Sequence, residues 1–172
     1  MGIFDWLFGV SKNKIEGNYK EEKREGLYKS YHENGQLESE GYYKCEIHGN
    51  LYFNLKDGLW KYYYDNGQLK EIGNHYDREL KIGLWKYYYE NGQLEKTGNY
   101  IESGLNPYFN LKDGLWKYYY DNGQLKSEGC YKGYIYVNGY NDNKKDGLWK
   151  YYNENGQLEK EIKFKDGEEI KN

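Results

Sequence analysis

The sequence has few of the residues that usually mark a stapled or secreted domain. Its 172 residues include one proline, one methionine and two cysteines. Cys45 and Cys130 are too few for a disulfide framework and are not spaced as a pair, so a reducing compartment is the simpler interpretation. The 25 basic and 28 acidic residues give a net charge of −3. A basic surface that would recognise nucleic acid is therefore not expected.

Long apolar runs are also missing. No segment approaches the length of a membrane span, and Met1 to Val10 lacks the basic leader and long apolar stretch of a secretory signal. We therefore expect a cytoplasmic protein.

Groupings typical of catalytic or metal sites are absent as well. Cys45 and His48 form the only local cluster of metal ligands, and no second pair has suitable spacing for zinc. We find no serine with a plausible base and no glycine-rich phosphate loop. Carboxylates such as Asp65 and Glu90 lie beside expected turns, where solvent exposure explains them. We expect no enzyme activity, no metal and no cofactor.

Aromatic residues and glycines are abundant, and they recur in a pattern. The chain has 24 tyrosines, five tryptophans and five phenylalanines, which argues against disorder. The motif Gly-Leu-Trp-Lys-Tyr-Tyr-Tyr, followed by an acidic residue and Asn-Gly-Gln-Leu, occurs in full or modified form five times. The five copies start near Gly26, Gly58, Gly83, Gly114 and Gly147. Self-similar units of this kind stack into one elongated array.

Each copy is predicted to form a β-hairpin. Leu59 to Tyr64 is rich in strand-forming residues, Asn66-Gly67 is a strong turn signal, and Gln68 to Tyr76 supplies the returning strand. Asn-Gly favours a two-residue type I′ turn in which both residues have positive φ. That turn would place Asp65 opposite Gln68.

Counting outward from this turn gives the rest of the register. Tyr64 is then opposite Leu69, Tyr62 is opposite Glu71, and Trp60 is opposite Gly73. An indole ring would lie across its own cross-strand glycine, where no side chain obstructs it. The same pairing is expected for Trp85 with Gly98 and for Trp116 with Gly129, while Trp149 has Ile162 at the glycine position.

The other face of the sheet is predicted to be exposed to solvent. The register sets lysine against glutamate in pairs that contribute no more than about 1 kcal/mol each. The pairs are Lys29 with Glu40, Lys117 with Glu128, and Lys150 with Glu161. A three-residue turn would shift the register by one residue and break both these pairs and the tryptophan–glycine pairs, so the two patterns together support the two-residue turn.

Three inserts lengthen the connections between copies and are the predicted binding edge. They are Leu51 to Leu55, Pro107 to Leu111, and Tyr134 to Tyr140. Connections on one edge would form a lip, where repeat proteins often place specificity. The candidate contact residues are Tyr52, Phe53, Tyr108, Phe109, Tyr134 and Tyr136.

The chain is expected to form an all-β, elongated, single-layer antiparallel meander of tandem hairpins with a short N-terminal helix. Residues 1–13 are an apolar segment, and residues 14–172 are the repeat domain. The apolar segment would cap the open edge of the sheet, dock on a partner, or contact a membrane surface. Exposed terminal strands would also permit pairing between two copies of the chain.

The repeated phrase Lys-Asp-Gly-Leu-Trp-Lys-Tyr-Tyr-Tyr, with the Asn-Gly-Gln-Leu-Lys that follows, resembles the bacterial variant of the MORN repeat (MORN_2). This variant is found in proteins often labelled YwqK-family antitoxin components. The resemblance extends from Ile15 to about Gly167. It implies an open sheet of successive hairpins, no established catalytic residues and, from the label, binding of a toxin. The Trp-Tyr-Tyr and glycine pattern also resembles choline-binding repeats more weakly.

Three functional hypotheses follow. The first is a non-enzymatic protein that binds another protein, with toxin neutralisation or immunity as its most specific form. The second is a membrane-peripheral scaffold anchored by Met1 to Val10. The third is a choline- or carbohydrate-binding protein that uses its aromatic repeats.

Overall fold

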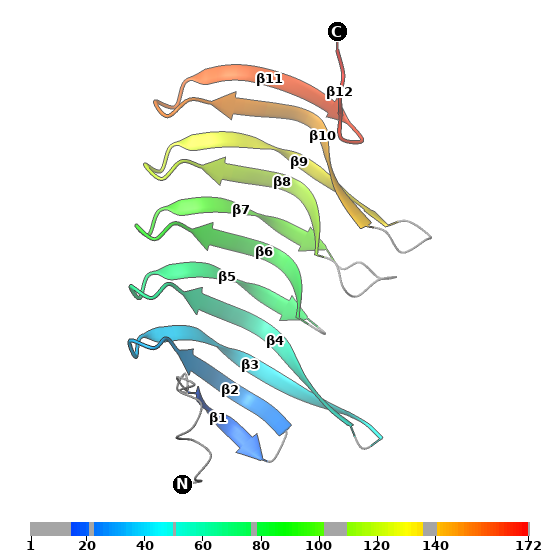
Figure 1. The fold of residues 1–172 in the computed structure, drawn as a ribbon. Helices are drawn as coiled ribbons and strands as arrows, with labels where there is room; N and C mark the ends of the chain where they lie inside the picture. The colour runs from blue at the N-terminus through cyan, green and yellow to red at the C-terminus, as the bar shows by residue number, and fades with distance from the viewer. Residues whose placement is uncertain are drawn as a thin grey trace, which may run out of the picture.

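The computed structural model describes residues 15–20, 23–49, 51–76, 79–101, 110–135 and 141–171. Within these ranges twelve strands form one antiparallel sheet in chain order, and no helix is present (Figure 1). The strands are β1 (Ile15–Lys20), β2 (Lys23–Tyr31), β3 (Leu37–His48), β4 (Leu51–Tyr63), β5 (Leu69–Tyr76), β6 (Leu80–Tyr88), β7 (Leu94–Ile101), β8 (Leu111–Tyr119), β9 (Leu125–Ile135), β10 (Asn141–Tyr152), β11 (Leu158–Lys165) and β12 (Glu168–Glu169). The predicted helix of residues 1–13 lies outside the described residues.

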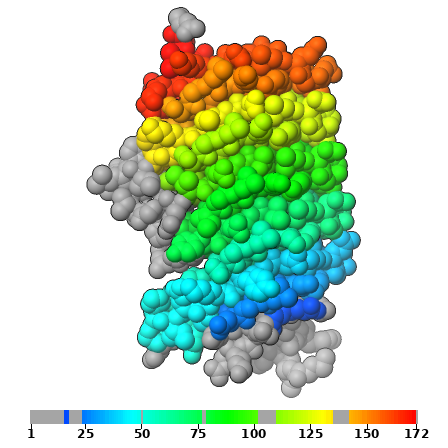
Figure 2. Space-filling model, turned by 180° about the vertical axis from the view of Figure 1, so that it is seen from behind, coloured from blue at the N-terminus to red at the C-terminus, as the bar shows by residue number. Residues whose placement is uncertain are grey.

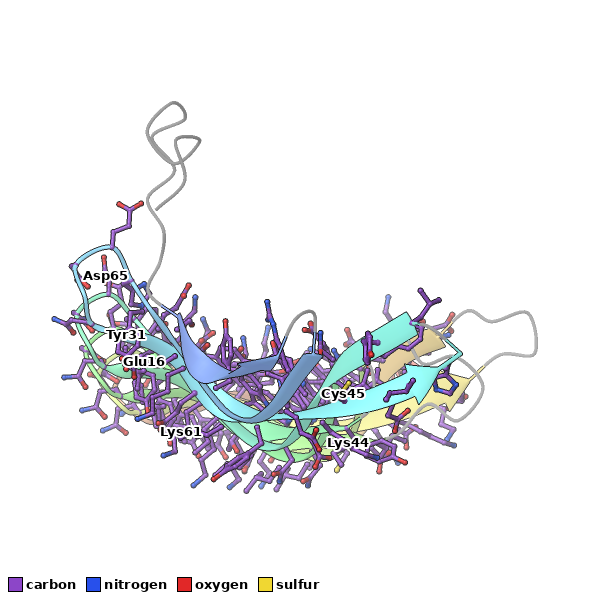
Figure 3. The ribbon with its side chains drawn as sticks, turned by 90° about the horizontal axis from the view of Figure 1, so that it is seen from below. Glu16, Tyr31, Lys44, Cys45, Lys61 and Asp65 are labelled. Carbon is purple, nitrogen blue, oxygen red and sulfur yellow. The ribbon has the colours of Figure 1, made fainter. Side chains whose placement is uncertain are left out.

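Each repeat is one hairpin, and the five hairpins are β2–β3, β4–β5, β6–β7, β8–β9 and β10–β11. Their turns lie along one rim of the sheet, and the strand ends at which one hairpin leads to the next lie along the other (Figure 1). The sheet is curved when it is viewed along the stacking direction, and Asp65 lies at the turn rim (Figure 3). The space-filling view shows the repeats as successive bands from β1 to β12 (Figure 2).

The hairpin turn differs from the prediction. The Gly67 N–H donates to the Tyr64 carbonyl at 2.9 Å, and the Tyr64 N–H donates to the Gln68 carbonyl at 2.8 Å. Gly67 has a φ of 82°, whereas Asn66 does not have positive φ. The loop therefore has three residues, and the predicted type I′ turn and the pairing of Asp65 with Gln68 are wrong. Asn-Gly also suits a type I turn followed by a left-handed glycine.

A β-bulge restores the register just beyond the turn. Tyr63, not Tyr64, is opposite Leu69, but Tyr62 is opposite Glu71 as predicted. Lys70 is the extra residue on the returning strand, so the one-residue offset of the longer turn is cancelled. The predicted lysine–glutamate pairs consequently form. Their N–O distances are 3.8 Å for Lys29–Glu40, 3.0 Å for Lys117–Glu128 and 3.6 Å for Lys150–Glu161.

The indole rings occupy a different place from the predicted one. Trp85 is opposite Gly98 in Cα register, but its ring lies over Gly73 of the preceding hairpin. A Cβ atom on Gly73 would be 2.2 Å from Trp85 Cδ2. We call the four glycines under these rings the covered glycines. The pairs of tryptophan and covered glycine are Trp60 with Gly41, Trp85 with Gly73, Trp116 with Gly98, and Trp149 with Gly129.

A distortion of the forward strand turns each ring toward the preceding hairpin. Gly83, two residues before Trp85, has a φ of 65°, and the β5–β6 register shifts between Ile72 and Asn74. The indole N–H of Trp85 then donates to the Asn74 carbonyl at 3.1 Å, beside the interruption in the strand ladder. These four tryptophans thus join one hairpin to the one before it. They are the main core of this single layer, at 0 to 1% exposed.

The first insert extends a hairpin instead of forming a loop. Leu51 to Leu55 belong to β4 and pair with β3, with Tyr52 opposite Ile47 and Phe53 opposite Glu46. This end of β3–β4 extends beyond the adjoining ends of β2, β5 and β6 (Figure 1). The insert asparagine Asn54 also accepts a hydrogen bond from the Arg24 N–H of the preceding hairpin at 2.7 Å. The insert therefore contributes to the stacking of the repeats.

Candidate functional site

One face of the sheet carries a continuous row of aromatic rings. Each indole has a tyrosine two residues further along its strand, with ring centroids 6.0 Å apart for Trp85 and Tyr87. Tyr100 of the returning strand meets Trp116 edge to face at 5.1 Å. We call this surface the aromatic face. The tryptophans are buried and the tyrosines are half-buried, so the rings are held rigidly while the hydroxyl groups remain near the surface.

A column of cations covers the indole rings. The lysine four residues before each tryptophan folds over its ring, with Nζ 4.0 Å from the ring centroid for Lys81 and Trp85. In the first repeat Arg24 lies over Tyr28 at 5.6 Å. The recurrence of lysine at this offset is visible in the sequence, but its contact with the ring follows only from the distorted strand. The cation column comprises Arg24, Lys56, Lys81, Lys112 and Lys145.

Two members of the column are neutralised by carboxylates. Lys81 Nζ is 2.7 Å from Glu71, and both side chains are about one-fifth exposed, at 19% and 21%. Lys56 Nζ is 3.4 Å from Glu79. Burial lowers the pKa of Lys81, and Glu71 opposes this change. Lys56 and Lys81 are therefore each balanced by a carboxylate on this face.

His75 replaces the tyrosine that the third and fourth hairpins have two residues after their covered glycines. Its Nε2 is 3.0 Å from the Tyr62 hydroxyl and its Nδ1 is 2.8 Å from the Glu79 carbonyl. Burial lowers the pKa of His75 to about 4, reinforced by Lys56 and Lys81, while the contact with the Glu79 carbonyl opposes the shift. A neutral imidazole is therefore part of the packed aromatic face near neutral pH.

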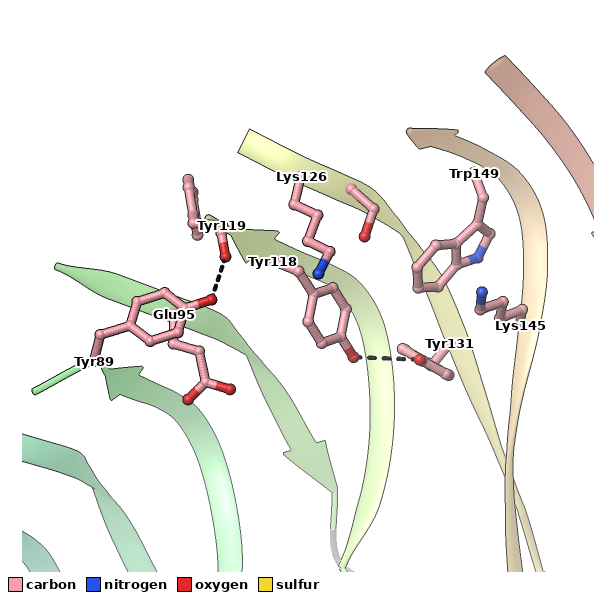
Figure 4. Close-up of a pocket in the computed structure, with 9 residues that line it drawn as sticks. Tyr89, Glu95, Tyr118, Tyr119, Lys126, Tyr131, Lys145 and Trp149 are labelled. Carbon is pink, nitrogen blue, oxygen red and sulfur yellow. Dashed lines mark hydrogen bonds between the residues drawn. The ribbon is translucent and has the colours of Figure 1, made fainter. Parts of the chain in front are cut away.

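A hollow of about 270 Å³ opens over the fourth hairpin, and residues of the third and fifth hairpins complete its lining (Figure 4). It lies beside Ser127, the residue two positions before the covered Gly129, where the second and third hairpins have Glu71 and Lys96. The hydroxyl group of Tyr118 donates to that of Tyr131 at 3.2 Å. The lining residues are Tyr89, Glu95, Tyr118, Tyr119, Lys126, Ser127, Tyr131, Lys145 and Trp149.

The charges around the hollow are mainly positive. The carboxylate of Glu95 pairs with Lys96 at 3.2 Å. Lys145 Nζ lies 4.3 Å from the Trp149 ring centroid, and Lys126 Nζ lies 5.2 Å from that of Tyr120. Neither lysine has an ion-pair partner among the residues that the structure describes. The hollow thus combines hydroxyl donors with two uncompensated cations.

Turn residues link neighbouring hairpins at the rim. The Tyr64 hydroxyl donates to the Tyr88 carbonyl at 2.7 Å, and the Asn66 side-chain amide donates to the Glu90 carbonyl at 3.1 Å. The same tyrosine contact recurs at Tyr89. Sequence reasoning assigned Asn-Gly to turn formation alone. Its recurrence is the signal that could have indicated this second role, since identical turns stack in register.

The opposite face carries partly exposed leucines and ion pairs. The leucine of each Gly-Leu-Trp motif is about half exposed, for example 52% at Leu84. Glu40 accepts hydrogen bonds from Lys61 at 3.1 Å and from the Tyr63 hydroxyl at 3.0 Å. Partial burial alone would raise the pKa of Glu40, but these donors lower it overall.

The structure does not gather the predicted contact residues into one site. Tyr52 and Phe53 are 44% and 38% exposed at the projecting end of β3–β4. Tyr134 lies at the end of β9, where its hydroxyl donates to the Asp166 carboxylate. Tyr108, Phe109 and Tyr136 lie outside the described residues. The role of all six residues as partner contacts stays a prediction.

In the described ranges no group of three or more His, Cys, Asp or Glu side chains could hold a metal ion. Cys45 and Cys130 are free thiols. The same ranges contain no helix with the length and apolar character needed to cross a membrane.

Comparison with known protein families matches five segments of the chain to the MORN repeat variant. The matched segments are residues 24–44, 56–77, 81–102, 112–132 and 145–166, which together make up more than half of the chain. Each segment holds most of one hairpin. No curated protein matches the chain.

Proposed function

The chain belongs to the MORN repeat variant family, and we propose from this membership that it is a non-enzymatic module that binds another protein. Proteins built from MORN repeats are typically binding or scaffold modules. The observation that carries the proposal is the aromatic face, where buried indoles fix rows of half-exposed tyrosines and lysines. Aromatic anchors with polar tips contribute large contact area at a low entropic cost, which suits a protein interface.

The most specific form of this proposal is a cytoplasmic antitoxin or immunity protein that covers a toxin. The resemblance of the repeat to antitoxin-labelled proteins supports it, and so does the low cysteine content. A rigid, curved sheet is a suitable surface for a folded partner, because little conformational entropy is lost on binding.

The test is affinity capture from the native lysate with two matched variants. Ser127→Trp fills the hollow on the aromatic face, and Leu115→Trp adds the same indole on the opposite face. We expect the wild type and Leu115→Trp to retain one stoichiometric partner and Ser127→Trp to lose it. Capture of no partner by the wild type, or equal capture by both variants, would contradict binding through the aromatic face.

Growth assays test the antitoxin form separately. The captured protein should arrest growth when it is expressed alone, and co-expression of the full chain should restore growth. A captured protein without toxicity would leave a binding module but exclude the antitoxin form. Flotation with liposomes, with and without residues 1–13, tests the rival membrane scaffold, since loss of flotation on truncation would favour an anchor.

A further inference from the structure

The cation column changes character between the third and fourth hairpins. Lys81 pairs with Glu71, and Lys56 pairs with Glu79. Lys112 and Lys145 instead have no carboxylate at ion-pair distance in the described part of the chain. Their positive charges are therefore available to a ligand.

The position two residues before each covered glycine explains the change. Glu71 occupies this position in the second hairpin and reaches Lys81 of the next one. The equivalent neighbour of Lys112 is Lys96, and the equivalent neighbour of Lys145 is Ser127. Burial lowers the pKa of Lys112, and the like charge of Lys96 lowers it further. A carboxylate supplied from outside would relieve both effects.

A chain of hydrogen bonds runs from Lys112 through Tyr118 to the hydroxyl group of Tyr131. Lys112 Nζ donates to the Tyr118 hydroxyl at 2.9 Å, and Tyr118 donates to Tyr131 at 3.2 Å. The hydroxyl proton of Tyr131 has no acceptor among the described residues. Tyr131, Lys145 and the small Ser127 all line the hollow (Figure 4). A carboxylate there would accept from the phenol and pair with the ammonium group.

The spacing of the repeats suggests the conformation of the ligand. Lys112 and Lys145 belong to successive hairpins, and two strand spacings separate such positions by on the order of 10 Å. A polyproline II chain has three residues per turn and a rise of about 3.1 Å per residue, so side chains three residues apart recur on one side at about 9 Å. Aromatic-lined grooves are known to hold this conformation, because its backbone is already extended.

We propose that the aromatic face from Lys112 to Lys145 binds an extended acidic segment of a partner protein, with one carboxylate in the hollow and another three residues away. Lys112 and Lys145 donate to neutral tyrosine hydroxyls, at 2.9 Å to Tyr118 and 2.8 Å to Tyr151, and neither has a carboxylate partner among the described residues. Charge complementarity therefore favours an acidic occupant over a basic or an apolar one. The inference rests on the proposed function, because it specifies the partner of the same face.

The test is fluorescence anisotropy with the full chain and a labelled Glu-Pro-Pro-Glu-Pro-Pro-Glu peptide. A peptide with glutamine in place of glutamate removes the charges, and an alternating Glu-Pro peptide changes their spacing. We expect both control peptides to bind at least about tenfold more weakly, as loss of a charge-assisted contact implies. Equal binding of the glutamine peptide would overturn the acidic recognition. Equal binding of the alternating peptide would overturn the spacing.

Variants of the protein test the site itself. Ser127→Glu supplies Lys145 with an internal carboxylate, as Glu71 does for Lys81. It should weaken binding of the glutamate peptide at least about tenfold without lowering the melting temperature of the protein. Lys145→Met should weaken peptide binding similarly, whereas Lys150→Met on the same strand should not. Glu71→Ser frees Lys81 and should add affinity. Unchanged binding by correctly folded Ser127→Glu would overturn the proposal.

The two sets of experiments test the acidic site and the proposed protein-binding function separately. Peptide binding with no partner captured from the lysate would retain the acidic site and contradict the proposed function. A captured partner combined with no peptide binding would retain the function and overturn the acidic site. A partner that remains bound to Ser127→Glu would also count against the acidic site.

Discussion

The boundary between the second and third hairpins and the boundary between the fourth and fifth are built alike but charged differently. The covered glycine would place a Cβ 2.2 Å from the indole of Trp85 at the first boundary and 2.3 Å from that of Trp149 at the second. The indole hydrogen bonds are 3.1 and 3.0 Å. The first boundary has a partly buried ion pair and a histidine, whereas the second adjoins the hollow and has Lys145, which has no carboxylate partner among the described residues.

This difference shows which positions determine architecture and which determine chemistry. Tryptophan, covered glycine and turn residues keep the same contacts at both boundaries. The residue two positions before the glycine varies between Glu71, Lys96 and Ser127, and with it the charge of the aromatic face. One repeat scaffold can therefore present different ligand chemistry along its length.

Substitution of a covered glycine should cause the largest loss of stability, and the loss should be similar at the two boundaries. Gly73→Ala and Gly129→Ala each place a methyl group 2.2 to 2.5 Å from atoms of an indole ring, which is closer than van der Waals contact. Each should lower the free energy of unfolding by at least about 3 kcal/mol. Urea unfolding followed by circular dichroism measures this loss. Thr97→Ala on the opposite face is the control; it removes the hydrogen bond from the Thr97 hydroxyl to the Trp85 carbonyl at 2.9 Å and should cost about 1 kcal/mol. A small loss at either glycine would show that its indole is not in contact.

Acid should weaken the second hairpin specifically through His75. The pKa of His75 is lowered to about 4, so between pH 6.5 and pH 4 the unfolded chain binds a proton that the folded chain excludes. Stability therefore falls as the pH falls, by up to about 3 kcal/mol from this residue. His75→Tyr, which copies Tyr100 of the third hairpin, should remove this component. Identical pH profiles of unfolding for wild type and variant would contradict the assignment.

Removal of cation-column lysines should separate the two boundaries. Lys81→Met leaves the partly buried carboxylate of Glu71 without its cation and should cost about 1 to 3 kcal/mol. Lys112→Met loses a ring contact but also removes a charge near Lys96, and should cost less than about 1 kcal/mol. Thermal melts of both variants give the comparison. Equal losses would mean that the internal ion pair does not distinguish the boundaries.

The smallest expected effect concerns the rim. Tyr89→Phe removes a hydrogen bond to the Tyr119 carbonyl and should cost about 1 kcal/mol. Tyr120→Phe should cost the same, since its hydroxyl contacts the Tyr152 carbonyl. Tyr88→Phe is a matched control, because no hydrogen-bond partner of its hydroxyl lies among the described residues. Chemical denaturation resolves these differences, and a loss at Tyr88 as large as at Tyr89 would contradict the rim contacts.

The repeats, the hairpins and the lysine–glutamate pairs could be predicted from the sequence. The β-bulge cancels the offset of the longer turn, so pairs at a fixed sequence separation, such as Lys117 with Glu128, remain opposite each other. The sequence did not determine the turn type, since a glycine with positive φ follows asparagine in both alternatives. It also could not assign the rings. Cα register pairs Trp60 with Gly73 of its own hairpin, but β3 of the preceding hairpin adjoins β4 on the other side, and the distortion at Gly58 decides the direction.

The hollow was not predictable for a different reason. Ser127 is an ordinary residue in the sequence, and its importance comes from the larger side chains that occupy equivalent positions in stacked neighbours. Its relation to Lys145 depends on which hairpins are adjacent. The same holds for Asn66, whose contact with the next turn requires the turns to lie in register.

Two-dimensional NMR with labelled tryptophan and glycine tests the stacking directly. Strong nuclear Overhauser effects are expected between the Gly73 α-protons and the Trp85 ring, and between the Gly129 α-protons and the Trp149 ring. Both glycine α-proton signals should be shifted upfield by the ring currents. Effects that join Gly73 to the Trp60 ring instead, with none to Trp85, would contradict the account.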